Sequence, residues 1–148
     1  MQTTYSIDIA ASADKVFHLL DDPEQLPTWL SMVVENEQLH ETAERIGTTF
    51  RQVVVENGRR RELLGTVTGY EPNKRLTLHL NAKGFDVDVE YILAETDGQT
   101  RLTQISDVHF HGLFKLMALL LAPFYQGSAQ SQLEKDFAKL KKLCEAEG

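Results

Sequence analysis

Alternation of apolar and polar residues between positions 32 and 110 constrains the fold of this chain more than any other feature. Within residues 85–93 every second residue is large and apolar, and Asp86, Asp88 and Glu90 lie between them. This is the pattern of a strand with one buried face. Turns such as Asn57-Gly58 separate six such runs and are too short for parallel crossovers. We therefore predict an antiparallel meander with strands at 32–41, 48–56, 59–70, 74–82, 85–93 and 100–110.

The segments on either side of the meander predict one more strand and three helices. Residues 3–9 alternate as a strand does, and two short helices follow, the first ending at Asp21-Asp22-Pro23 and the second holding Trp29. At the other end, Ala129, Leu133, Phe137, Leu140 and Cys144 form one stripe of an amphipathic helix. We expect the opposite, exposed face of that helix to carry Glu134, Lys135, Asp136, Lys139, Lys141, Lys142 and Glu145.

This element order predicts an α+β fold in a single domain covering residues 1–148. One face of the sheet would be covered by the long C-terminal helix, and 148 residues suffice for one ordinary core. A curved sheet that grips one helix rarely closes tightly. We therefore expect a hollow between sheet and helix, of the kind in which small ligands bind.

Composition excludes several classes of protein. The chain has 15 Lys and Arg against 22 Asp and Glu, and its net charge of -7 opposes nucleic acid as a partner. Its single cysteine, Cys144, excludes an internal disulfide framework and a cysteine-rich metal site. The start of the chain lacks the pattern of a signal peptide, and the apolar run 113–124 is shorter than the about 20 residues of a membrane span. We expect a cytoplasmic protein without a transmembrane segment.

Segments spread over nearly the whole chain carry a family resemblance. They are residues 7–23 with Leu26-Pro27-Thr28-Trp29, residues 47–50, 67–76 and 98–102, and the helix 133–147. Together they resemble the START-like, or SRPBCC, superfamily, and within it the polyketide cyclase/dehydrase-like branch. The resemblance implies a helix-grip fold (Bet v 1/START-like) with an apolar cavity. Its members include cyclases of aromatic polyketides, lipid and quinone carriers, and hormone receptors. They share no catalytic residue, so none is transferred to this chain.

Inward-facing positions supply the candidate binding residues. Gln104 and Ser106 share a strand face with Leu102, and Gln52 lies between Phe50 and Val54 on another. Such polar groups on an apolar wall need partners, which a ligand, water or neighbouring protein groups would supply. Trp29 is either a structural plug or a cavity-lining aromatic. The candidate ligand-binding residues are Trp29, Phe50, Gln52, Val54, Leu78, Leu80, Val87, Val89, Tyr91, Leu102, Gln104, Ser106, Phe137 and Leu140.

Two further clusters have both a structural and a functional interpretation. Asp107, His109 and His111 share one strand face, but residues four apart on a strand lie about 13 Å apart, so we expect a surface cluster and no metal site. We also expect no cofactor. Arg59, Arg60 and Arg61 follow a tight turn and are expected at a solvated hairpin end, with an anionic head group as the alternative.

The apolar segment Leu113–Phe124 carries Lys115 as its one charge. It is either the first buried turns of the long helix, bent at Pro123, or a gate hinged at Gly112 and Pro123 that covers the cavity. Contact with a second copy of the chain, another partner or a membrane surface is a further alternative, because so many large apolar residues are hard to bury on one stripe.

These observations favour binding over catalysis. The inward polar residues Gln52, Gln104 and Ser106 do not titrate near pH 7, and we expect no inward histidine or carboxylate. We therefore predict a carrier or sensor of an apolar small molecule, whether lipid, isoprenoid or aromatic and polyketide-like. A cyclase or dehydrase-type enzyme acting on such a ligand is one alternative, with no catalytic residue assigned. A protein-interaction module with a vestigial cavity is the other.

Overall fold

Seven antiparallel strands form one sheet in the order β1-β7-β6-β5-β4-β3-β2. The computed structural model describes residues 2–56 and 58–146, apart from the side chains of residues 118–129. The strands are β1 (Gln2–Ile9), β2 (Val33–His40), β3 (Thr49–Glu56), β4 (Arg59–Glu71), β5 (Arg75–Ala82), β6 (Phe85–Thr96) and β7 (Gln99–Phe110). The helices are α1 (Ala13–Asp21), α2 (Leu26–Trp29) and α3 (Leu113–Glu145).

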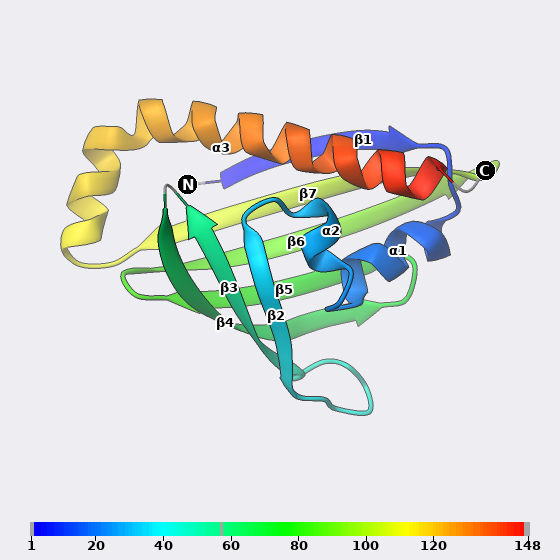
Figure 1. Ribbon diagram of the computed structural model, residues 1–148, viewed down its shortest axis with the longest axis horizontal. Coiled ribbons are helices and arrows are strands. Elements are labelled where there is room, and N and C mark those ends of the chain that lie inside the picture. Colours follow the sequence, from blue (N-terminus) through cyan, green and yellow to red (C-terminus); the bar gives the residue numbers. More distant parts are fainter. Residues whose placement is uncertain (1, 57, 147–148) are drawn as a thin grey trace.

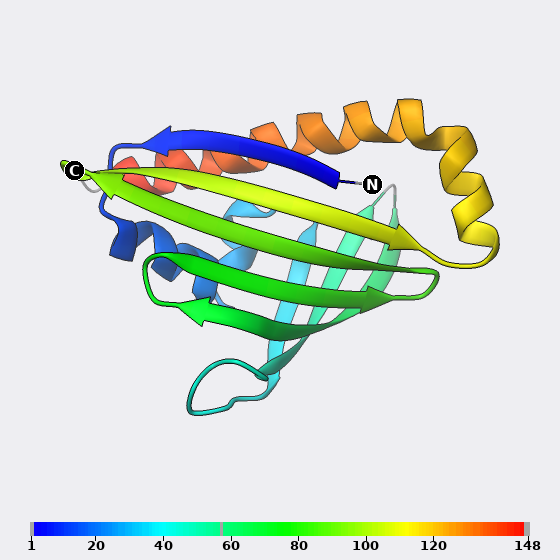
Figure 2. The ribbon, with the colours of Figure 1, turned by 180° about the vertical axis from the view of Figure 1, so that it is seen from behind.

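The sheet is strongly curved, and α3 lies along its concave side next to β1 and β7 (Figures 1 and 2). Register shifts interrupt the β2–β3 pairing at two places and the β4–β5 pairing between Val67 and Gly69. Such irregularities bend a sheet and increase its twist. The α+β helix-grip architecture predicted from the sequence is confirmed, and the predicted strands and helices are all present, with ends that differ by a few residues.

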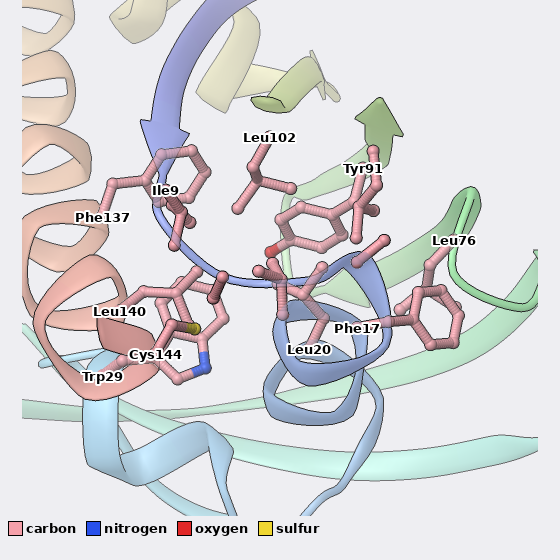
Figure 3. Packing of buried hydrophobic residues seen from close by; sticks show 14 of the residues in the cluster. Ile9, Phe17, Leu20, Trp29, Leu76, Tyr91, Leu102, Phe137, Leu140 and Cys144 are labelled. Carbon is pink, nitrogen blue, oxygen red and sulfur yellow. The ribbon is translucent and has the colours of Figure 1, made fainter. Parts of the chain in front are cut away.

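The core lies between α3, the two short helices and the sheet. Figure 3 shows Phe137, Leu140 and Cys144 reaching from α3 toward Trp29, and all four are fully buried. The indole of Trp29 donates a hydrogen bond to the carbonyl oxygen of Leu19 over 3.0 Å. Because the only polar group of its side chain has a hydrogen-bond partner, Trp29 can be fully buried where α1, α2 and α3 meet.

The expected exposure of Asp136 is wrong, since only 5% of this residue is exposed. Asp136 follows Leu133 by three positions and precedes Leu140 by four, so it lies on the same helix face as the apolar stripe. Its Oδ1 atom accepts hydrogen bonds from the Ser31 hydroxyl at 2.7 Å and from the Gln132 amide at 3.0 Å. The bond from Ser31 links α3 to the segment that follows α2, and the bond from Gln132 lies within α3.

The first turns of α3 stand at a steep angle to the rest of the helix and close one end of the molecule (Figure 1). Gly112, directly before them, has a φ of 59°, a backbone angle that glycine adopts at little cost. Leu113 and Leu116 are 80% and 60% exposed, whereas the Phe114 ring packs against Gly84 in the β5–β6 turn. The rest of the predicted gate, including Leu120 and Pro123, falls among the side chains outside the described part.

Candidate ligand-binding site

Two cavities lie on the concave side of the sheet. The inner cavity has a volume of about 190 Å³ and is enclosed by α1, α2 and the middle of the sheet. Its apolar walls include Phe50 on β3, Leu76, Leu78 and Leu80 on β5, and Val89 on β6. The polar residues on its walls are Asp21, Asn36, Gln38, Arg45, Thr48, Gln52 and Gln104.

The outer cavity has a volume of about 460 Å³ and lies toward the end of the molecule closed by the first turns of α3. Leu30 and Gln52 line both cavities, so the two adjoin. Phe114 and Met117 of α3 form part of the outer wall, and Arg61 of β4 lines it as well. Its remaining lining residues are Met32, Val33, Val54, Glu56, Leu63, Phe85, Val87, Val108, Phe110 and Asp136.

The structure brings most of the predicted binding residues to these walls. The inner cavity takes seven of them, namely Phe50, Gln52, Leu78, Leu80, Val89, Tyr91 and Gln104, and the outer cavity adds Val54 and Val87.

The other five predicted residues line neither cavity. Trp29, Leu102, Phe137 and Leu140 are fully buried in the core cluster. Ser106 accepts a hydrogen bond from the Gln104 amide over 2.9 Å. These five residues therefore lie outside the two cavity walls, which the other nine help to form.

An ion pair separates the inner cavity from an open depression on the surface. Arg45, in the β2–β3 loop, contacts Asp21 at the end of α1 over 2.8 Å. The Tyr70 hydroxyl donates to the other oxygen of Asp21, also over 2.8 Å, and the Arg45 guanidinium lies 5.5 Å from the Tyr70 ring centre. Asp21 and Arg45 line both the cavity and the depression, as do Pro23, Asn36 and Gln38, so this pair forms part of the wall between them.

Burial and hydrogen bonding shift the pKa values of this group. Burial by itself lowers the pKa of Arg45, but the hydrogen bond and the charge of Asp21 outweigh it and leave that pKa raised. Burial, together with the same carboxylate, raises the pKa of the Tyr70 phenol. Arg45 therefore stays a cation and Tyr70 a neutral donor at physiological pH.

Sequence reasoning missed most of the polar residues that line the cavities, and two of them, Asp136 and Arg45, differ in whether the sequence held a signal. Asp136 reaches the outer cavity because of its place on the α3 stripe, which the 3.6-residue period could have revealed. Arg45 reaches the inner cavity from a loop, with a φ of 69°, and nothing in its sequence context indicates an inward position. Burial and the charge of Asp136 raise the pKa of the Tyr91 phenol.

Asp107, His109 and His111 do not reach the cavities. They lie in a row of acidic and histidine side chains. His109 lies 3.5 Å from both Asp88 and Asp107, and His111 pairs with Asp86. In the described part of the chain, no three histidine, cysteine or acidic side chains are grouped to hold a metal ion.

Burial raises the pKa of the Cys144 thiol to about 11, so the thiol stays protonated.

Comparisons with known proteins agree with this architecture. A family model described as polyketide cyclase / dehydrase and lipid transport matches residues 1–145. A search of curated protein sequences finds no match. None of the helices within the described residues is long and apolar enough to cross a membrane.

Solved structures of the same fold cover the chain from end to end. Protein TTHA0849 from Thermus thermophilus is 18% identical, with a TM-score of 0.83 over 100% of this chain and 99% of its own. A START superfamily protein from Mycobacterium smegmatis is 18% identical, with a TM-score of 0.80 over 99% of each chain. Ara h 8.0201 is 16% identical, with a TM-score of 0.72 over 97% of each chain. The START-like resemblance is thereby confirmed for the fold.

Proposed function

Because this chain belongs to the polyketide cyclase / dehydrase and lipid transport family, we propose that it binds an apolar small molecule as a carrier or sensor. The ligand would be a lipid, an isoprenoid or an aromatic, polyketide-like compound, and it would lie in the inner and outer cavities. The observation that carries this proposal is the apolar surface that lines the two adjoining cavities, each of which has several times the volume of about 30 Å³ that one water occupies.

The nine lining residues that the sequence predicts are proposed to contact the ligand. Leu78, Leu80 and Val89 form apolar wall, and Gln52 lies at the junction of the two cavities. Burial of a ligand's apolar surface there provides about 25 cal/mol for each Å² removed from water. A cytoplasmic location is part of the proposal, since the single free cysteine offers no disulfide. The net charge of -7 continues to argue against nucleic acid as a partner.

Titration with the neutral fluorophore N-phenyl-1-naphthylamine tests the proposal. We expect saturable binding by the native chain, and strong loss of binding in Leu80→Trp, which fills the inner cavity. Leu64→Trp is the matched control, because Leu64 lies on the neighbouring strand β4, is 50% exposed and lines neither cavity. Failure of the native chain to bind, or equal binding by folded Leu80→Trp, would overturn the proposal. Native mass spectrometry of protein from its own host would then identify the ligand.

A cyclase or dehydrase-type enzyme is the second candidate function, and the position of Asp136 favours it. This buried carboxylate lines the outer cavity, where an acid or base could reach a ligand. Its hydrogen bonds to Ser31 and Gln132 also give it a structural role. Chemical change of a ligand identified by mass spectrometry, lost in Asp136→Asn with retained binding, would establish the enzyme. A protein-interaction module with a vestigial cavity is the less favoured alternative, given the volumes of both cavities.

A further inference from the structure

Three buried polar atoms lack a hydrogen-bond partner, and all three belong to residues that line the inner cavity. They are Asn36 Oδ1, Arg45 Nε and Gln104 Oε1. Among the described residues, these are the only buried side-chain nitrogen or oxygen atoms without a partner. Native proteins pair nearly all such atoms with protein, water or ligand. All three residues line the inner cavity, and Asn36 and Arg45 also border the surface depression, so a hydrogen-bonding occupant of the inner cavity would supply the missing partners.

The three atoms come from separate parts of the cavity wall. Gln104 lies on β7 and Asn36 on β2, which are separated by four strands in the sheet order, and Arg45 lies in the loop after β2. The Gln104 amide nitrogen already donates to Ser106. Turning the amide over would let its oxygen accept from the Ser106 hydroxyl and leave the nitrogen unpaired instead. Either orientation therefore leaves one amide atom of Gln104 without a partner.

Charges around the cavity indicate the kind of group that fits. Arg45 is the cation on the inner wall, and its two terminal nitrogens already contact Asp21 at 2.8 Å and Glu41 at 3.3 Å. A carboxylate placed in the inner cavity would lie beside Asp21, and Arg45, the one cation among the described residues that line this cavity, is already paired with Asp21 and Glu41. An uncharged hydroxyl suits the site, because it accepts from Arg45 Nε–H and donates to an amide oxygen.

On this basis, and resting on the proposed function, we propose that the ligand is an apolar molecule with at least one uncharged hydroxyl. The alcohol or phenol end would lie in the inner cavity against Arg45, Asn36 and Gln104. The apolar remainder would extend past Gln52 into the outer cavity, whose walls include Val54, Leu63 and Phe85.

Three related probes test this proposal by displacement of N-phenyl-1-naphthylamine at pH 7. They are naphthalene, 2-naphthol and the anion 2-naphthoate, which share one apolar body. We expect 2-naphthol to bind about fivefold more tightly than naphthalene, the advantage of a net hydrogen bond, and more tightly than 2-naphthoate. In Gln104→Leu and Asn36→Leu the ratio of the naphthalene dissociation constant to that of 2-naphthol should fall toward one. Gln99→Leu, at the exposed start of β7, is the control that should leave the ratio unchanged.

The outcomes separate this inference from the proposed function. Equal affinity of native protein for naphthalene and 2-naphthol would overturn the hydroxyl inference and leave apolar binding intact. Tighter binding of 2-naphthoate than of 2-naphthol would also overturn it. An advantage of 2-naphthol that survives both substitutions would show that these amides do not recognise the hydroxyl. Binding of none of the probes, the fluorophore included, would overturn the proposed function itself.

Discussion

The ring of Phe50 occupies the space beside Gly65 that a side chain at that position would need. The two residues lie directly opposite each other on β3 and β4. A Cβ atom added at Gly65 would overlap three atoms of the Phe50 ring. Phe50 is also part of the inner cavity wall, so the missing side chain of Gly65 determines how far this ring intrudes on the cavity.

Gly65→Ala should therefore push the Phe50 ring toward the inner cavity. We expect the free energy of unfolding to fall by about 1–3 kcal/mol, as for other overpacked sites, and the affinity for N-phenyl-1-naphthylamine to fall with it. Urea unfolding and fluorescence titration measure the two effects. The double variant Gly65→Ala, Phe50→Leu should recover part of both, because the smaller side chain makes room. No loss in the single variant would contradict the assigned packing.

Alternation along the strands was sufficient to predict the fold and much of the cavity wall. Phe50, Gln104 and Val89 lie inward because each occupies the correct parity on its strand, and parity can be read from sequence. Strand parity does not distinguish the residues that line a cavity from those that are buried in the core. Leu102 and Gln104 share one face of β7, yet only Gln104 lines a cavity, since Leu102 lies in the buried core cluster that includes Phe137 and Leu140 of α3. Arg45 depends on loop geometry and on a partner, Asp21, that lies 24 residues away in the sequence.

The Asp21–Arg45 pair should contribute more to stability than a surface pair does. Both side chains are mostly buried, and removal of the carboxylate would leave the guanidinium and the Tyr70 hydroxyl short of an acceptor. We expect Asp21→Ala to lower the free energy of unfolding by about 1–3 kcal/mol in urea titrations. Asp8→Ala is the matched control. Asp8 pairs with Arg101 at 2.9 Å, but both side chains are largely exposed, so a much smaller change is expected. Equal effects of the two substitutions would refute this ranking.

His79 should make stability depend on pH in the neutral range. Its hydrogen bond to Asp88 raises the pKa of the imidazole above its ordinary 6.5 in the folded chain. The folded state thus holds the proton more tightly than the unfolded state does. Its stabilising effect is complete below pH 6.5 and is lost as pH rises through the raised folded-state value. The half-exposed setting limits the effect to about 0.2–1 kcal/mol.

Urea unfolding at pH 5.5 and pH 8.5 measures this effect when the native chain is compared with His79→Gln. The native chain should be the more stable of the two at the lower pH, and the difference should shrink at the higher pH. His40→Gln serves as control, since His40 lies exposed on β2, at an edge of the sheet and away from Asp88 on β6. A difference that is constant or grows with pH would contradict the assigned contact.

Leu116 tests whether the first turns of α3 act as a contact surface or gate. It is 60% exposed on the segment 113–124, whereas Leu140 on the same helix is fully buried. Leu116→Asp should leave the free energy of unfolding within about 0.5 kcal/mol of the native value, because an exposed site adds a charge to water. Leu140→Asp should unfold the chain by burying an unpaired charge, as loss of near-UV circular dichroism would show. If the exposed leucines meet a second chain, Leu116→Asp should also weaken self-association in sedimentation velocity. An unfolded Leu116→Asp would show that this segment is core, and a folded variant with unchanged self-association would refute its role as an interface.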